Sequence, residues 1–216
     1  MKREFDLIVF DWDGTLMDSE AKIVRCMINA AQDAGIPDPG APAVRHIIGL
    51  SLAEAIEALF PDVDAARREF IVERYREHFV HLDDTVTDLF PGVSEGLDAL
   101  KRCGYQLAVA TGKARRGLER VLDQTGTAHL FSATRCADEA FSKPHPQMLQ
   151  DLLDQTGTAP ERALMVGDTV YDLEMARNAR VPGLAVSYGV HPRERLMDCA
   201  PLACLDSFAE VRAWLV

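Results

Sequence analysis

The sequence predicts a doubly wound α/β fold in which an all-helical domain is inserted near the start of a parallel sheet. Short apolar runs bounded by Gly and Asp alternate with stretches in which apolar residues recur at helical spacing. Such runs suit parallel strands that are covered on both faces, and their alternation with helices is typical of doubly wound sheets. One long segment after the first run shows helical patterns alone. With 216 residues, 48% of them apolar, the chain can bury a core without disulfides or a structural metal.

Six apolar runs are predicted to be strands. The stronger ones are residues 7–10, 107–110, 163–166 and 184–187, and weaker ones lie near 132–136 and 203–205. Helical patterns fill the intervals, and those around residues 93–100, 118–122 and 148–153 each stop before a glycine that can end a helix. The hexapeptide Asp-Gln-Thr-Gly-Thr-Ala occurs at 123–128 and again at 154–159, so the same helix ending is predicted twice.

The segment between residues 19 and 82 is predicted to form about four helices and no strand. Ile23 and Met27 follow helical spacing, and Ser51 with Glu54 has the pattern of a capping box at a helix start. We therefore predict a helical domain of residues 18–88 inserted into an α/β core of residues 1–17 and 89–216. The hinges are expected near residues 17–18 and 83–90.

Composition excludes several classes of partner. The formal net charge is −11, so most of the surface repels nucleic acid and anionic membranes. No apolar stretch approaches the ~20 residues of a membrane helix, and the first apolar run is too short for a signal peptide. The five cysteines show no C-x-x-C spacing, which favours a reducing compartment. We expect a cytoplasmic protein that binds neither nucleic acid nor membrane.

The first predicted strand ends in two carboxylates, Asp11 and Asp13, followed by Gly14. Ligands of parallel α/β sheets bind beyond the carboxyl ends of the strands, and Gly14 permits the turn that lets both carboxylates face that crevice. A buried pair of carboxylates is costly unless a cation or a proton compensates it, which implies a hard divalent cation. The plainer interpretation is a turn at Asp13 and a helix cap at Asp11.

Three further strand ends carry polar residues. Thr111 and Gly112 end the second strong strand, where a hydroxyl and free amides can bind a phosphate oxygen. Lys143 precedes a helical pattern, an unfavourable place for a cation unless an anion binds there. Asp168 and Asp172 bracket a strand-to-helix turn, from which both can reach one metal or simply support the helix start.

These motifs, in this order, resemble those of the haloacid dehalogenase-like superfamily. The run from Asp11 to Leu16 matches D-x-D-G-T-L, Thr111 matches the hydroxyl motif, Lys143 the lysine motif, and the run from Gly167 to Asp172 the acidic motif. The helical insert after the first motif resembles the C1 cap of this superfamily. The resemblance spans nearly the whole chain and implies a Rossmann-like core with a helical cap.

The resemblance also implies roles for the motif residues. Asp11 would attack phosphorus and form an aspartyl phosphate, and Asp13 would act as general acid and then general base. Thr111, Gly112 and Lys143 would bind the phosphoryl group, with Lys143 also assisting catalysis. Mg²⁺ would be held by Asp11, by the backbone carbonyl of Asp13, and by Asp168, with Asp172 in support.

The motif sequences and the cap type look closest to those of the phosphoglycolate phosphatase-like group. This resemblance implies that the substrate is a small phosphorylated metabolite such as 2-phosphoglycolate or a sugar phosphate. In the cap, Arg45 either binds an anionic substrate tail or is a solvated helix-end residue. Alternatives are a β-phosphoglucomutase-like phosphomutase, a pyrophosphatase and a non-enzymatic aspartyl-phosphate signalling module. Dehalogenation is disfavoured because Asp13 supplies an acid that halide does not need. A monomer or homodimer is expected.

Overall fold

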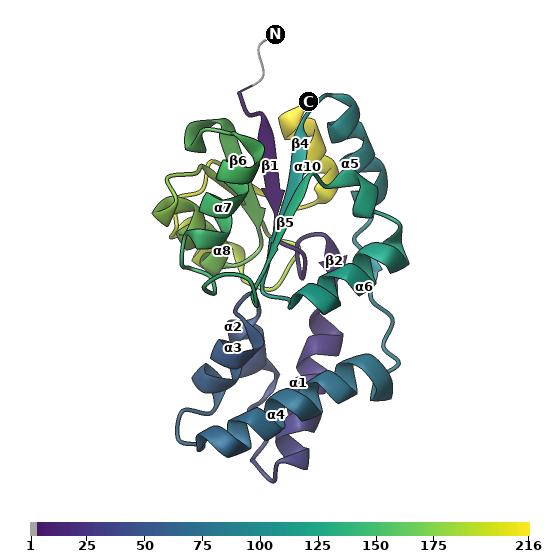
Figure 1. Cartoon of the computed structure of the whole chain (residues 1–216), viewed down its shortest axis with the longest axis vertical. Helices are drawn as coiled ribbons and strands as arrows, with labels where there is room; N and C mark the ends of the chain where they lie inside the picture. The colour runs from purple at the N-terminus through teal and green to yellow at the C-terminus, as the bar shows by residue number, and fades with distance from the viewer. Residues whose placement is uncertain (1–3) are drawn as a thin grey trace.

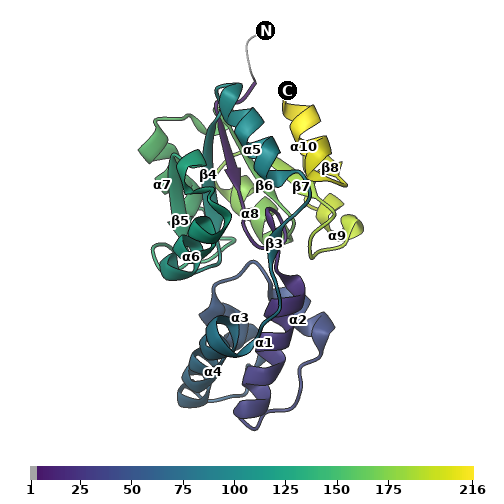
Figure 2. The same cartoon turned by 90° about the vertical axis from the view of Figure 1, so that its right-hand side faces the viewer.

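The computed structural model describes residues 4–216, which form an α/β core and a helical cap at one end of it (Figures 1 and 2). The core contains a six-stranded sheet in the order β5-β4-β1-β6-β7-β8, in which every pairing is parallel. The strands are β1 (Leu7–Phe10), β4 (Gln106–Thr111), β5 (Ala133–Cys136), β6 (Ala163–Gly167), β7 (Gly183–Val186) and β8 (Cys204–Leu205). The predicted doubly wound parallel sheet is confirmed.

Helices cover both faces of this sheet (Figure 1). They are α5 (Val93–Arg102), α6 (Arg115–Thr125), α7 (Gln147–Thr156), α8 (Val170–Asn178), α9 (Arg193–Met197) and α10 (Phe208–Leu215), with short 3₁₀ turns at Ala128–Leu130 and Pro160–Arg162. The side chains of β1 alternate between the two layers of helices. Ile8 and Phe10 pack in one apolar cluster with α5, α6 and α10, whereas Leu7 and Val9 pack in another with α7 and α8. Because side chains alternate across a strand, a fully apolar run was the sequence signal of a strand covered on both faces.

The cap consists of α1 (Glu20–Asp33), α2 (Ala41–Ile47), α3 (Leu52–Leu59) and α4 (Ala65–Glu77), followed by a π-helical turn over His78–Leu82. Ser51 begins α3 as predicted, its side chain accepting a hydrogen bond from the Glu54 amide. These helices share a separate apolar cluster that includes Ile23, Met27 and Ile71. The cap therefore has a small core of its own.

Two short strands connect the cap to the core. β2 (Met17–Asp18) and β3 (Asp88–Leu89) pair in antiparallel fashion, with Met17 opposite Leu89. They lie where the sequence predicts the hinges. The carboxyl ends of the core strands face the cap (Figures 1 and 2). No helix in residues 4–216 is both long and apolar enough to cross a membrane.

Candidate active site

Three buried carboxylates meet at the carboxyl end of the sheet. Asp11 follows β1, Asp168 follows β6, and Asp172 lies in the first turn of α8. Each offers an oxygen within 4.8 Å of the others. The strand order places β1 directly beside β6, so the structure brings together side chains that are more than 150 positions apart in the sequence. The carboxylate of Asp13 does not belong to this cluster.

Lys143 is the cation within the cluster. Its fully buried Nζ lies 2.7 Å from Asp11 Oδ1 and 2.6 Å from Asp172 Oδ1. Burial alone would lower the pKa of Lys143, but the two carboxylates outweigh burial and raise it, so the side chain stays charged. A lysine just before a helix is unfavourable by itself. At Lys143, the carboxylates of Asp11 and Asp172 compensate for this.

One ammonium does not balance three carboxylates. Burial raises the pKa of Asp11 well above its usual value, and Asp172 and Asp168 add to this effect while Lys143 opposes it. Burial and the neighbouring Asp172 raise the pKa of Asp168 to about 7. Among residues 4–216, Asp11 Oδ2 has no hydrogen-bond partner although it is buried. A cluster of oxygen ligands with excess negative charge and an orphaned oxygen fits a hard divalent cation.

Neighbouring hydroxyl and amide groups hold Asp168 and Asp172 in place. Asp168 accepts hydrogen bonds from the Thr15 hydroxyl (2.8 Å) and the Val190 amide (2.8 Å). Gly14 has φ = +81°, and a Cβ there would lie 2.2 Å from Asp168 Oδ2, so both the turn and the close approach require glycine. Asp172 also completes a capping box with Thr169, so it supports the helix start as predicted while belonging to the carboxylate cluster.

Asp13 lies beside the cluster and has its own partners. Its Oδ1 accepts a hydrogen bond from Ser19 Oγ at 2.5 Å and forms an ion pair with Lys113 Nζ at 3.0 Å. The sequence analysis did not assign a role to Lys113 or Ser19. The signal for Lys113 was its position two residues after Thr111, at a strand end that already carried a predicted site residue.

Thr111 and Gly112 lie at the carboxyl end of β4, next to β1, and Gly112 also approaches the cap. Thr111 is buried at the end of β4, and its hydroxyl oxygen accepts a hydrogen bond from the Lys113 amide at 3.1 Å. A Cβ on Gly112 would lie 2.5 Å from the carbonyl oxygen of Leu50. The cap loop that contains Leu50 therefore packs directly against the backbone of Gly112, next to Thr111.

Further contacts hold this cap loop against the core. The Ser51 amide donates to the Ser142 hydroxyl at 2.8 Å. At the end of α2, the His46 carbonyl accepts a hydrogen bond from the Tyr171 hydroxyl at 2.9 Å, and Arg195 lies 2.7 Å from the His46 ring. His46 is therefore part of the contact between cap and core.

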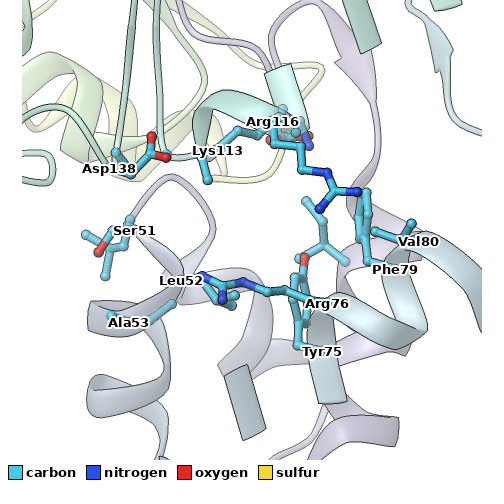
Figure 3. A pocket seen from close by; sticks show the side chains of 18 of the residues that line it. Ser51, Leu52, Ala53, Tyr75, Arg76, Phe79, Val80, Lys113, Arg116 and Asp138 are labelled. Atoms are coloured by element: carbon cyan, nitrogen blue, oxygen red, sulfur yellow. The ribbon is translucent and has the colours of Figure 1, made fainter. Parts of the chain in front are cut away.

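A cavity of about 1080 Å³ lies between the cap and the core (Figure 3). Asp13 and Lys113 line it on the core side, and Tyr75 and Phe79 line it on the cap side. Arg45 is not among the lining residues. It is half exposed and pairs with Glu20, in the first turn of α1, at 2.5 Å. That Arg45 binds the substrate stays a prediction.

Comparison with known proteins agrees with this geometry. The family model described as haloacid dehalogenase-like hydrolase matches residues 8–186. A protein of Dickeya dadantii named probable phosphatase IndB is 36% identical over 209 residues, covering 95% of this chain and 91% of that protein. A phosphoglycolate phosphatase of Nitrosococcus oceani is 31% identical over 218 residues, covering 98% of this chain and 97% of that one.

A similar solved structure is the crystal structure of a predicted phosphoglycolate phosphatase from Haemophilus somnus. It superposes with a TM-score of 0.90 at 26% identity and covers 99% of both chains. The resemblance seen in the four motifs thus extends to the whole chain, cap included. The chain belongs to the haloacid dehalogenase-like hydrolase family, in its phosphoglycolate phosphatase-like group, and is a phosphatase.

Proposed function

We propose that the protein is a magnesium-dependent phosphatase that hydrolyses a small organic phosphate monoester through an aspartyl phosphate on Asp11. The observation that carries the proposal is the setting of Asp11. Its carboxylate is buried at the end of the central strand, faces Lys143 on one oxygen and leaves the other oxygen without a partner among the described residues. A carboxylate in such a setting suits attack on phosphorus better than a purely structural role.

The surrounding residues each support one part of this reaction. Asp11 attacks phosphorus, and the bond to the ester oxygen breaks. Asp13, held by Ser19 and Lys113, protonates the leaving oxygen and then takes a proton from the water that hydrolyses the aspartyl phosphate. Lys143 and Thr111 bind phosphoryl oxygens, where their positive charge and hydroxyl group stabilise the transition state.

The donor set suits magnesium. When bound, Mg²⁺ held by the carboxylates of Asp11, Asp168 and Asp172 and by the backbone carbonyl of Asp13 supplies positive charge that offsets the charge of the phosphoryl group. All of these donors are oxygens, which favours a hard cation over zinc or copper. Thr15 and the Val190 amide fix the orientation of Asp168 as a ligand.

The cavity favours an organic ester over inorganic pyrophosphate. Its volume of about 1080 Å³ is in the range that accommodates drug-sized molecules in other proteins. A pyrophosphate ion would leave most of this space to water. The contacts of the cap loop with Gly112 and Ser142 support a role for the cap in covering the site during the reaction. A cytoplasmic location and a monomeric or homodimeric state stay predictions.

The test is phosphate release from a panel of esters, with Mg²⁺ and with EDTA. The panel includes 2-phosphoglycolate, hexose phosphates, nucleotides and pyrophosphate. We expect release that depends on Mg²⁺ and is absent from the Asp11→Asn variant. Transfer of the phosphoryl group between sugar positions without release would contradict hydrolysis and favour the phosphomutase alternative. Equal release by wild type and Asp11→Asn would contradict the covalent mechanism.

A further inference from the structure

A short core segment, residues 189–191, lies between the carboxylate cluster and the cap. It follows β7 and precedes α9 in the chain. The Val190 amide donates a hydrogen bond to Asp168 Oδ2 at 2.8 Å, and the His191 amide donates one to the Asp168 carbonyl oxygen at 3.3 Å. The backbone of this segment therefore holds both the side chain and the main chain of one member of the cluster.

The segment packs closely on the cluster. A Cβ on Gly189 would lie 2.4 Å from Asp168 Oδ2 and 2.3 Å from the Gly14 carbonyl oxygen, so a side chain there would displace them. Just before the segment, the Tyr188 hydroxyl donates to the Thr15 carbonyl oxygen at 2.8 Å. Because contacts this close leave no free space, a shift of the segment also moves the carboxylate of Asp168.

The side chains of the same segment reach the cap. Val190 packs against the apolar cluster of the cap. His191 is buried, and its ring centroid lies 6.0 Å from that of His46 at the end of α2. Arg195 on α9 contacts both imidazole rings, because its Nη1 lies 2.7 Å from His46 Nδ1 and 3.3 Å from His191 Nε2. The segment thus contacts the cap with its side chains and Asp168 with its backbone.

The ring of His191 also contacts the start of the helix that carries Asp172. Its Nδ1 accepts a hydrogen bond from the amide of Val170, the first residue of α8, at 3.1 Å. In the same helical turn, the Tyr171 hydroxyl donates to the His46 carbonyl oxygen at 2.9 Å. The cap is therefore connected to the acidic strand-to-helix turn by hydrogen bonds as well as by the packing of residues 189–191.

We propose that residues 189–191 couple the position of the cap to the geometry of the metal site, with Val190 and His191 as positioning residues for Asp168. While the cap packs on Val190 and His191, the segment holds the carboxylate of Asp168 in the orientation that a divalent cation needs. Loss of the cap contact frees the segment and loosens this ligand. The inference rests on the proposed function, because it takes Asp168 as a magnesium ligand.

Coupling of this kind acts in both directions. If docking of the cap raises the affinity for Mg²⁺, binding of Mg²⁺ favours docking of the cap by the same factor. The ligand set is then complete only while the cap covers the site. This restricts the reaction to substrate that is already shielded from water.

The test measures Mg²⁺ affinity without turnover, by calorimetric titration of the metal-free protein in the absence of substrate. His46→Ala and Arg195→Gln remove cap contacts and leave the carboxylate cluster unchanged in composition. We expect the Kd for Mg²⁺ to rise about 5-fold or more in each, the lower end of typical coupling between two sites. Val190→Ala keeps the amide that holds Asp168 but shortens the side chain that packs on the cap, so its Kd should rise as well.

Arg193→Gln is the matched control, because Arg193 lies on the same helix, α9, and pairs with Asp206 of the core. Its Kd for Mg²⁺ should equal that of the wild type, and an equal rise in this variant would reject the coupling. A lower melting temperature of the metal-free protein with an unchanged Kd in His46→Ala and Arg195→Gln would show a purely structural contact. That result would overturn the inference while leaving the phosphatase proposal intact. A wild type that binds no Mg²⁺ would overturn both.

Hydrogen exchange tests the reverse direction. Relative to EDTA, Mg²⁺ should slow amide exchange in the peptide of residues 41–51, which covers α2 and the loop after it. This protection should be absent from His46→Ala and Arg195→Gln. The peptide of α4, which packs on α1 and α3 within the cap, is the internal reference and should exchange equally in both conditions. Equal exchange of residues 41–51 with Mg²⁺ and with EDTA in the wild type would contradict the proposal.

Discussion

Lys143 Nζ lies 2.7 Å from Asp11 Oδ1 in a site from which solvent is excluded. The same ammonium contacts Asp172 at 2.6 Å, so one cation joins a strand end to a helix start. Removing one member of a buried ion pair leaves an uncompensated charge, which typically costs 3–5 kcal/mol. The stability of the core and the chemistry of the site therefore depend on the same contact.

Lys143→Met tests this dependence. We expect the free energy of unfolding in EDTA to fall by about 3 kcal/mol, because Asp11 and Asp172 lose their cation. Millimolar Mg²⁺ should restore part of the loss, since it brings positive charge back to the cluster. Urea unfolding followed by circular dichroism measures both values. A loss below about 1 kcal/mol would show that protonation of the carboxylates replaces the ammonium at little cost.

Asp11→Asn should separate activity from stability. Loss of the nucleophile is expected to lower kcat by at least about 10⁴-fold. In EDTA at pH 8 the variant should be more stable than the wild type, because the raised pKa of Asp11 means that its buried carboxylate destabilises the fold when ionised. Phosphate release and urea unfolding on the same preparation give both numbers. A less stable variant would mean that attraction to Lys143 outweighs burial.

Asp13→Ala should impair both halves of the reaction. Loss of a positioned general acid and base is expected to lower the rate about 10²–10⁴-fold. Rapid-quench measurement with a labelled ester distinguishes formation of the aspartyl phosphate from its hydrolysis, and both should slow. Esters with a good leaving group, such as 4-nitrophenyl phosphate, should lose less in the first half-reaction. An unchanged rate with an alkyl ester would reject the role assigned to Asp13.

The pKa of Asp168 predicts how metal binding responds to pH. Because its folded-state pKa is raised to about 7, the stability that neutral Asp168 contributes is fully present below its unfolded-state pKa of about 3.9 and is lost as pH rises through about 7. Mg²⁺ needs the ionised form, so its effect on the melting temperature should be several-fold larger at pH 8 than at pH 5.5. Melting curves with and without Mg²⁺ measure this. An equal shift at both pH values would contradict the prediction.

Gly112→Ala tests the contact between the cap loop and the core. The new Cβ would lie 2.5 Å from the Leu50 carbonyl oxygen, so the loop must move away. We expect kcat/KM to fall about 10-fold or more while the melting temperature changes by only a few degrees. Gly117→Ala is the control, because the nearest atom to its Cβ would be 3.9 Å away, and on a helix it should stabilise the protein by about 0.5–1 kcal/mol. Similar effects of both substitutions on kcat/KM would reject the assigned contact.

The sequence by itself determined the positions of the six core strands, the helix endings and the residues of the carboxylate cluster. Apolar runs bounded by Gly and Asp located the strands within two residues at either end, because a strand buried on both faces needs an apolar side chain at every position. The hexapeptide repeat ends α6 and α7 in the same way, with Gly126 and Gly157 both left-handed. Asp11 and Asp168 could be grouped from sequence because parallel strands end at one edge of the sheet, whereas Lys143, in the loop after β5, was grouped with them through the order of the four motifs.

Only the tertiary structure decided which charged side chains from separate elements meet. Sequence spacing does not fix how one helix is rotated against another, so it could not show that Arg45 pairs with Glu20. It also could not show that Lys113 contacts Asp13. Each of these depends on side chains from separate elements within a few ångströms, where a Coulomb interaction is strong and its partner is chosen by packing.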